Sequence, residues 1–233
     1  MKLLYEGKAK RLYEGSESGA LVMEFLDRAT AFDGKKVAEP EGKGRLNAEI
    51  STILFGVLKR EGIKTHYIKK IDEKRILVKK LRMFPLEVVV RNIATGSIVR
   101  RLGIEKGKVF SPPLVEFFMK DDILGDPLIC EGHIFSLGIA SPSEIEHIKS
   151  ESLRVNEMLK IYFEKRGLNL VDMKLEFGKD GEGNIFLGDE ITPDTMRLWD
   201  VKTGESYDKD VFREDKGNII FVYRSLLKRM EME

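Results

Sequence analysis

The stretch Leu170-Val171-Asp172-Met173-Lys174-Leu175-Glu176-Phe177-Gly178 alternates apolar and polar side chains. This alternation is typical of a β-strand, in which successive side chains point to opposite faces. We therefore expect Asp172, Lys174 and Glu176 to share one face, while the apolar residues fill the other. This face of the strand therefore carries two carboxylates and one ammonium, and the segment bears on both the fold and the function.

The segment that follows predicts a hairpin. Residues 179–184 are rich in glycine and short polar side chains, and Ile185–Glu190 reads as a returning strand. The turn would set Asp189 within reach of Glu176 and Lys174. Two carboxylates suit Mg²⁺, which takes one or two protein carboxylates and completes its shell with water and substrate phosphate. Taken alone, the hairpin also fits an ordinary amphipathic strand with a solvated polar face.

Composition places the chain among globular proteins and limits its partners. The 233 residues are 42% hydrophobic and 34% charged, and 40 Lys and Arg nearly cancel 39 Asp and Glu to leave a net charge of +1. No overall field therefore favours nucleic acid or an anionic membrane, and any anion site must be local. We expect neither nucleic acid nor membrane as a partner.

The cysteine count and the absence of long apolar runs bear on location. Cys130 is the only cysteine, which excludes an intrachain disulfide and fits a reducing compartment; we expect a buried thiol. No apolar run approaches the length of a membrane span, and Met1–Tyr5 leads directly into charged sequence. The expected location is the cytoplasm.

The apolar periodicity and the turn and capping residues predict an α+β protein of two lobes. Residues 1–84 are strand-rich, with one helix indicated by apolar residues at helical spacing from Leu46 to Leu58. Residues 85–233 form the larger α+β lobe. Its long helix begins after Ser141, where Pro142 and Glu144 complete a capping signal, and runs to about Arg166. A polar loop over Thr192–Asp215 and a helix over Ile219–Met230 complete the prediction.

The opening Gly7-Lys8-Ala9-Lys10 lies between two apolar strands. Glycine lets the backbone approach a ligand, and the lysines place ammonium groups over it, which would suit nucleotide phosphates. The segment is not a Walker motif. A hairpin turn with exposed lysines is the alternative.

A second lysine pair precedes the connector between the lobes. Lys79 and Lys80 end a predicted strand before the apolar connector Leu81–Glu87. In kinase-like nucleotide sites a strand lysine meets phosphate, and the connector between lobes would hold the adenine. Because strand side chains alternate, only one of Lys79 and Lys80 can face the cleft. A solvated lysine pair is the alternative.

A candidate second anion site combines Arg91 with the turn Ala94-Thr95-Gly96-Ser97. A small-residue turn that opens a helix offers N–H groups and a hydroxyl to a phosphate, and arginine adds bidentate pairing. Arg197 follows the hairpin closely and could reach the same ligand. Lys120 ends a predicted strand and could enter the cleft. The alternative is a capped surface helix with a basic face.

Four ordered blocks resemble the SAICAR synthetase family. They are the opening Gly7–Lys10, Met83–Arg91 with Thr95-Gly96-Ser97, Leu170–Gly178, and Gly188-Asp189-Glu190 through Arg197–Asp200. The resemblance spans nearly the whole chain. It implies a two-lobed fold with a kinase-like or ATP-grasp-like nucleotide lobe, and a ligase of purine biosynthesis. Such an enzyme joins L-aspartate to the carboxylate of carboxyaminoimidazole ribonucleotide (CAIR), with ATP as co-substrate and Mg²⁺ as cofactor. A homodimer is also expected.

The resemblance also implies roles for individual residues. The ATP set is Gly7, Lys8, Ala9, Lys10, Lys79, Lys80, Leu81, Met83 and Glu87, with the phosphates at Lys8 and Lys10, the adenine at the connector and Glu87 near the ribose. Glu176 and Asp189 would carry magnesium. The CAIR set is Arg91, Gly96, Ser97, Lys120 and Arg197. Lys174 would lie near the reacting carboxylate, and Asp172 and Asp33 are the candidate bases.

One segment departs from the pattern of the family. At Thr30-Ala31-Phe32-Asp33-Gly34, many bacterial members of the family have a glycine where Phe32 stands.

A kinase-like lobe also fits a phosphotransferase, because a fold does not fix the acceptor. The Lys and Arg clusters could instead belong to a non-catalytic anion-binding module, for example one for RNA, although the balanced charge argues against it.

Overall fold

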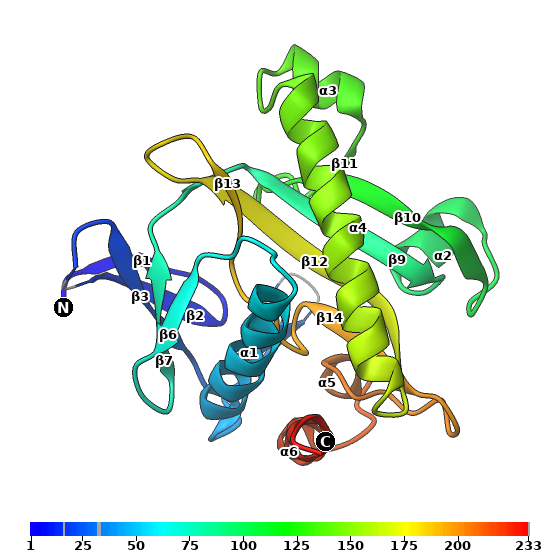
Figure 1. The fold of residues 1–233 in the computed structure, drawn as a ribbon. Helices are drawn as coiled ribbons and strands as arrows, with labels where there is room; N and C mark the ends of the chain where they lie inside the picture. The colour runs from blue at the N-terminus through cyan, green and yellow to red at the C-terminus, as the bar shows by residue number, and fades with distance from the viewer. Residues whose placement is uncertain (16, 32–33, 233) are drawn as a thin grey trace.

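The computed structural model describes residues 1–15, 17–31 and 34–232, and it builds them around two antiparallel sheets (Figure 1). The first sheet has the order β1-β2-β3-β7-β6. Its strands are β1 (Leu3–Glu6), β2 (Lys10–Glu14), β3 (Ala20–Phe25), β6 (Tyr67–Lys70) and β7 (Arg75–Lys79). The predicted hairpin through residues 72–74 is confirmed as the β6–β7 pair.

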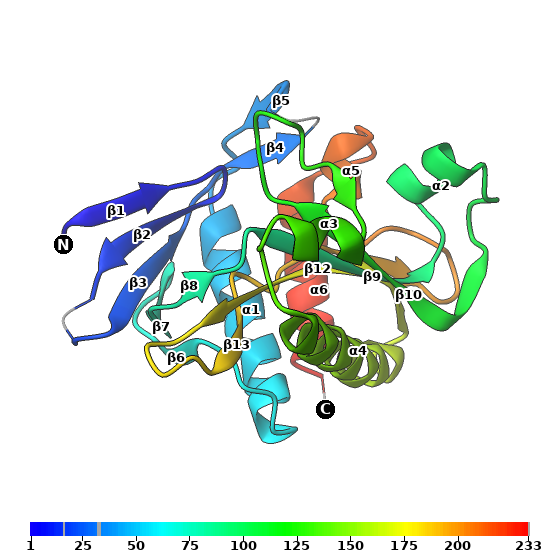
Figure 2. The ribbon, with the colours of Figure 1, turned by 90° about the horizontal axis from the view of Figure 1, so that it is seen from above.

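The second sheet contains the strand that opened the sequence analysis. Its order is β11-β10-β9-β12-β13, and β8 and β14 also pair with β12. The strands are β8 (Arg82–Met83), β9 (Leu86–Ile93), β10 (Val109–Met119), β11 (Leu128–Ile129), β12 (Leu168–Lys179), β13 (Ile185–Gly188) and β14 (Met196–Asp200). A small hairpin of β4 (Ala29–Ala31) and β5 (Lys36–Ala38) stands apart from both sheets (Figure 2).

Three long helices cover the sheets. α1 (Lys43–Arg60) packs on β3 and β6, α4 (Pro142–Glu164) lies along β12, and α6 (Ile219–Met230) packs on α1. In Figure 1, α4 crosses in front of the second sheet. The short helices are α2 (Ser97–Leu102), α3 (Glu131–Ser136) and α5 (Asp210–Arg213). No helix within the described residues has the length and apolar composition to cross a bilayer.

Local sequence signals explain where the long helices begin. At α4, Ser141 Oγ accepts from the Glu144 amide and Glu144 Oε2 accepts from the Ser141 amide at 2.8 Å, which is the predicted capping box. At α6, Asn218 Oδ1 accepts from the amides of Ile220 and Phe221. Both caps satisfy amides that have no partner inside the helix.

One hydrophobic cluster joins the two sheets. It includes Phe25 and Ile76 from the first sheet, Leu54 from α1, and Val88 and Phe177 from the second. The chain changes sheet between Lys79 and Arg82, close to the predicted boundary at residue 84. The mixed α+β fold class is confirmed, whereas the division into lobes at that residue stays a prediction.

Two expectations about local structure and one alternative were wrong. Cys130 is exposed, because it caps α3 directly after the edge strand β11. The segment Thr192–Asp215 is not a loop throughout, since it contains β14 and α5. The polar face of β12 is not solvated: Asp172 is 3% exposed and Glu176 2%, because basic side chains from neighbouring strands close over it.

Candidate active site

A cavity of about 650 Å³ brings both lobes of the prediction together. Its wall includes the β1–β2 turn of the first sheet and the polar face of β12 in the second. Of the predicted site residues, it is lined by Gly7, Lys8, Ala9, Lys10, Glu87, Lys120, Lys174 and Glu176. The cavity therefore collects the predicted phosphate-binding lysines Lys8 and Lys10, the predicted magnesium ligand Glu176 and the predicted catalytic Lys174, whereas Asp189, Asp172, Arg91 and Arg197 are not part of its lining.

A cluster of lysines and carboxylates lies at the β13 end of β12. Lys174 Nζ donates to Glu176 Oε1 at 2.9 Å and to Glu87 Oε1 at 2.8 Å. Lys120 Nζ donates to Glu176 Oε2 at 2.5 Å. Lys10 forms ion pairs with Asp189 and, at 3.2 Å, with Glu190. Three strands, β2, β9 and β12, and the loops after β10 and β13 thus converge on one network of alternating charge.

The network shifts the pKa values of Lys10, Lys174 and Asp189. Burial alone would lower the pKa of Lys174, but the carboxylates of Glu176, Asp189 and Glu87 outweigh it and raise that pKa well above its ordinary value. The same competition raises the pKa of Lys10. Burial would raise the pKa of Asp189, and Lys10 and Lys174 reverse this and lower it. Lys174 is therefore a cation at neutral pH and suits electrostatic stabilisation, not proton abstraction.

Of the predicted magnesium ligands, Glu176 lies on β12 and Asp189 directly follows β13, the strand paired with it. Glu176 lies opposite Gly188, which directly precedes Asp189. Asp189 has φ of 58°, a left-handed conformation that non-glycine residues seldom adopt. Among the described residues, no three His, Cys, Asp or Glu side chains form a ready metal cage. The carboxylates of Glu176 and Asp189 are paired with lysines. Two carboxylates suit Mg²⁺, which takes its other ligands from water and nucleotide phosphate.

A second cluster at the other end of β12 is built around Arg91, which is 3% exposed. Its guanidinium donates to Glu116 Oε2 at 2.6 Å, to Asp172 Oδ2 at 2.9 Å and to Ser97 Oγ at 3.2 Å. The arginine is thus held in a fixed orientation by strands on both sides of β9. Ser97 opens α2, so its hydroxyl lies beside both the guanidinium and the first turn of that helix.

Arg197 of β14 completes the arginine cluster. It donates to Asp172 Oδ2 at 2.9 Å and to Asp210 Oδ2 at 2.7 Å. A Cβ on Gly96 would lie 3.1 Å from Arg197 Nη2, and Gly96 has φ of 65°. Glycine is therefore required there both by conformation and by the close guanidinium. Burial would lower the pKa of Arg197, but Asp172 and Asp210 raise it.

The remaining ATP candidates are spread along the first sheet and the connector. Lys8 reaches across to Asp122 at 2.7 Å, an exposed ion pair. Lys79 lies 3.3 Å from Asp180 and over the ring of Phe186, whereas Lys80 is exposed. Lys79 thus faces the β12–β13 hairpin and Lys80 does not, but neither lysine lines the cavity, so the assignment of one of them to ATP stays a prediction.

The connector packs on two glycines of the hairpin. A Cβ on Gly178 would lie 2.8 Å from Met83 Sδ and 2.9 Å from Leu81 Cβ, and one on Gly188 would meet the same two residues. Met83 remains 38% exposed. The predicted adenine residues therefore form an apolar surface adjoining the carboxylate cluster. Asp33, one of the two candidate bases, lies outside the described residues, as does Phe32.

Sequence reasoning missed a third cluster beneath the cavity. Lys43 of α1 is fully buried and pairs with Asp194, whose Oδ1 accepts from Tyr223 of α6 at 2.7 Å. Asn47 donates to Asp194 Oδ2 at 3.0 Å. Lys209 also reaches the cavity wall. The only sequence signal for this cluster is that Asp194 lies close to the hairpin, because α1 and α6 approach it only in the folded chain.

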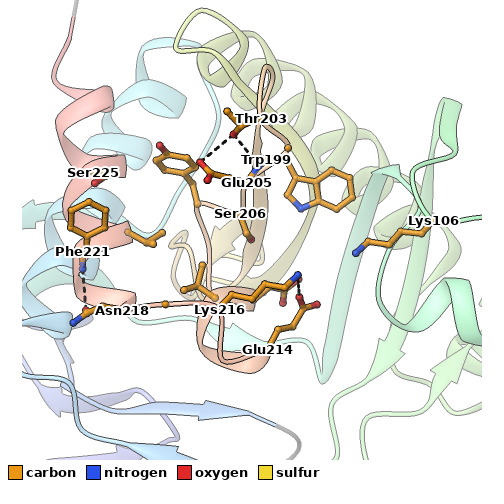
Figure 3. Close-up of a pocket in the computed structure, with 16 residues that line it drawn as sticks. Lys106, Trp199, Thr203, Glu205, Ser206, Glu214, Lys216, Asn218, Phe221 and Ser225 are labelled. Atoms are coloured by element: carbon orange, nitrogen blue, oxygen red, sulfur yellow. Dashed lines mark hydrogen bonds and ion pairs between the residues drawn. The ribbon is translucent and has the colours of Figure 1, made fainter.

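A further cavity, of about 780 Å³, lies between α6 and the turn after β14 (Figure 3). Trp199, Phe221 and Lys106 contribute to its wall. None of the predicted site residues lines this cavity, although Trp199 belongs to a block of the family resemblance. Of its charged residues, Asp210 pairs with Arg197 and Lys106 lies over the ring of Trp199. The smaller cavity, with its buried ion network, is the candidate active site.

Comparison with known proteins gives consistent matches along the chain. A family model described as SAICAR synthetase matches residues 3–230. A phosphoribosylaminoimidazole-succinocarboxamide synthase of Wolinella succinogenes is 51% identical over 98% of this chain and 97% of that protein. A solved structure of a type-2 SAICAR synthetase in complex with ADP is 50% identical, with a TM-score of 0.96 over 100% of this chain and 98% of that one. The corresponding enzyme of Ehrlichia chaffeensis gives 43% identity and a TM-score of 0.96, with 98% of each chain covered.

Proposed function

The chain belongs to the SAICAR synthetase family, and we propose that it joins L-aspartate to the carboxylate of CAIR with consumption of ATP. The family supports ATP-dependent SAICAR formation in purine biosynthesis, and a relative that binds ADP supports a nucleotide substrate. The products would be SAICAR, ADP and phosphate.

One observation in the structure carries this proposal: a single strand connects the two charge clusters. Asp172, Lys174 and Glu176 alternate along β12, at a rise of about 3.3 Å per residue. Asp172 holds the arginines at one end, Glu176 belongs to the carboxylate cluster at the other, and Lys174 lies between them. A substrate with a phosphate at one end and a reacting carboxylate at the other would match that order.

The nucleotide would occupy the side of the cavity formed by the β1–β2 turn, the connector and the hairpin. In this proposal Lys8 and Lys10 bind the phosphates, with Gly7 and Ala9 giving the backbone room to approach. The connector, with Leu81 and Met83, takes the adenine. Glu87 accepts a hydrogen bond from Lys174, so a contact of Glu87 with the ribose would compete with that ion pair.

Magnesium would be held by Glu176 and Asp189. When bound, it would neutralise phosphate charge as ATP reacts. The ion pairs of these carboxylates with Lys10, Lys120 and Lys174 would then loosen, which frees the three ammonium groups to face phosphate and substrate carboxylate.

The ribonucleotide would be bound by the arginine cluster. Arg91 and Arg197 present N–H groups beside the Ser97 hydroxyl and the N-terminus of α2, an arrangement that suits a phosphate. Gly96 keeps that approach open. Lys120 and Lys174, farther along the same sheet, would lie near the carboxylate that reacts.

The chemistry proposed at this site has two steps. A carboxylate oxygen of CAIR attacks the γ-phosphorus of ATP, and ADP leaves, which gives an acyl phosphate. The amine of L-aspartate then attacks the carbonyl carbon, the C–O bond to phosphate breaks, and the nitrogen loses a proton. Lys174 stabilises the negative charge that develops on the oxygens, because its pKa keeps it cationic. Asp172 and Asp33 remain the candidate acceptors of the proton.

Three further expectations stay part of this proposal. The homodimer and the cytoplasmic location rest on the family resemblance and on the composition, and light scattering of the purified chain tests the first. The absence of nucleic acid among the partners rests on the net charge of +1.

The test is ADP release from ATP, Mg²⁺ and CAIR, with and without L-aspartate, combined with mass spectrometry of the products. ADP and an aspartyl amide appearing together, and only with aspartate, is the expected result. ADP without an amide would indicate a phosphotransferase, and no turnover would contradict the proposed activity.

A further inference from the structure

Glu116 of β10 accepts hydrogen bonds from two arginines that lie on different elements. Its Oε2 accepts from Arg91 Nε at 2.6 Å, and its Oε1 accepts from Arg101 Nη2 at 2.6 Å. Arg91 belongs to β9, whereas Arg101 lies in the last turn of α2. Glu116 is 8% exposed, so its carboxylate is largely shielded from solvent. One buried carboxylate therefore connects a strand of the second sheet to α2.

The register of the second sheet places Glu116 in a row of alternating charge. Arg91 lies opposite Leu114 of β10 on one side and Asp172 of β12 on the other. Glu116 is two residues along β10 from Leu114, so its side chain points to the same face of the sheet as that of Arg91. Ion pairs of at most 2.9 Å join the members of the row, which are in order Arg101, Glu116, Arg91, Asp172, Arg197 and Asp210. Positive and negative charges balance along it.

The guanidinium of Arg91 is bonded through three different nitrogens. Nε donates to Glu116, Nη1 donates to Asp172 at 2.9 Å, and Nη2 donates to the Ser97 hydroxyl at 3.2 Å. A planar group held by carboxylates from two neighbouring strands cannot rotate without breaking one of these bonds. The bond to Glu116 therefore helps to set the direction in which Nη2 points, which is toward Ser97.

Helix α2 depends on the same carboxylate for its position. Among its six residues, all of which the structure describes, Ile98 alone is buried, so apolar packing contributes little to where the helix lies. The bond between Arg91 and Ser97 ties the beginning of α2 to β9, and the bond between Arg101 and Glu116 ties its last turn to β10. Loss of the Glu116 carboxylate would release both the last turn of α2 and one edge of the Arg91 guanidinium.

We infer that Glu116 is a positioning residue for the phosphate of the ribonucleotide, because it fixes the Arg91 guanidinium and the Ser97 hydroxyl relative to each other. Glu116 acts through these two donors and does not contact the substrate itself. The identity of the phosphate as that of CAIR rests on the proposed function.

The charge of Glu116 and its positioning role would affect a bound phosphate in opposite directions. As a negative charge near the site, Glu116 repels the phosphate, so removing the charge alone would tighten binding. As the group that aligns the donors, Glu116 strengthens binding, so its removal would weaken it. The direction in which the affinity for CAIR changes therefore tests the inference.

The first experiment compares Glu116→Gln, which keeps the size of the side chain and removes its charge, with wild type. Glu105→Gln is the matched control, since Glu105 is exposed in the segment between α2 and β10. Amide formation is followed at varied CAIR with ATP and L-aspartate saturating. We expect Glu116→Gln to raise KM for CAIR at least tenfold, with kcat within threefold and KM for ATP within twofold of wild type. An unchanged or lower KM for CAIR would overturn the inference.

Arg101→Met provides a second variant, which also serves if Glu116→Gln does not fold, as judged by loss of thermal protection by ADP. It removes the tie between α2 and β10 and leaves the bond between Arg91 and Glu116 in place. We expect a rise of about threefold in KM for CAIR, and a KM within twofold of wild type would contradict the inference. The double variant should be no worse than Glu116→Gln alone, because both changes act through one carboxylate. Effects that multiply in the double variant would also contradict it.

A binding measurement separates this inference from the proposed reaction. Protection by ribose 5-phosphate against thermal unfolding is measured for wild type and Glu116→Gln, and its concentration dependence gives an apparent Kd. A Kd at least tenfold higher in the variant supports the positioning role even if wild type forms no amide, in which case only the proposed reaction fails. Equal or tighter binding of ribose 5-phosphate by the variant would overturn the inference.

Discussion

Arg197 donates hydrogen bonds from Nη1 to both carboxylate oxygens of Asp172, at 2.9 and 3.2 Å. Arg91 donates to the same carboxylate, so one negative charge holds two guanidinium groups in place. We expect Asp172→Asn to lower the free energy of unfolding by roughly 3 kcal/mol, because removing one partner leaves buried charge uncompensated. KM for CAIR should rise as well. Urea denaturation with Glu157→Gln, an exposed change on α4, as control checks this; equal stability of both variants would contradict it.

The carboxylate cluster predicts the effect of neutral substitutions. Glu176→Gln and Asp189→Asn should each lower kcat on the order of 100-fold or more, as does removal of other preorganised electrostatic contacts. Both should also shift the Mg²⁺ concentration for half-maximal activity upward. The matched control is Glu182→Gln in the exposed hairpin turn. Near-normal turnover in both cluster variants would show that the magnesium assignment is wrong.

The connector depends on the absence of a side chain at Gly178. A Cβ there would lie under 3.0 Å from both Met83 Sδ and Leu81 Cβ, so Gly178→Ala must displace the connector. We expect KM for ATP to rise about tenfold, as for one lost contact of about 1.4 kcal/mol, with KM for CAIR little changed. Gly181→Ala is the control, since nothing lies within 4 Å of its added Cβ. Equal ATP kinetics in the two variants would refute the adenine assignment.

His66 predicts a specific loss of stability in acid. It is 4% exposed, and burial lowers its pKa to about 4 from the ordinary 6.5. As the pH falls, His66 of the unfolded chain therefore binds a proton before His66 of the folded chain does. The contribution of neutral His66 to the free energy of unfolding is fully present above pH 6.5 and is lost as the pH falls toward 4. This linkage is worth up to about 3 kcal/mol. The difference between the free energies of unfolding at pH 7 and at pH 4.5 should be smaller in His66→Phe than in wild type. His147→Phe, at an exposed site on α4, should keep the wild-type pH dependence.

The sequence predicted the elements whose signals are local. Ser141 and Glu144 mark the start of α4 because a capping box needs only neighbours, and the helix Ile219–Met230 was predicted with the bounds that the structure shows. Alternation identified β12 and the shared face of Asp172, Lys174 and Glu176. It could not show that this face is buried, because the covering groups Arg91 and Lys120 come from strands more than 50 residues away.

Contacts between distant segments account for what the sequence did not show. Lys43, Asp194 and Tyr223 meet only because α1 and α6 pack together, and none of the three lies in a recognisable motif. Strand β14 was missed because its five residues lie within a polar stretch. Cys130 was assigned to the interior on the general preference of thiols, whereas its place at a sheet edge decides its exposure.

The central claim is that this site activates a carboxylate with ATP before an amine attacks it. The direct measurement uses CAIR labelled with ¹⁸O in its carboxylate, together with ATP, Mg²⁺ and L-aspartate, and analyses the phosphate released. The account predicts that each phosphate carries one ¹⁸O for every amide formed, because the oxygen that attacks phosphorus leaves with it. Amide accompanied by unlabelled phosphate, or labelled CAIR recovered without any phosphate release, would contradict the account.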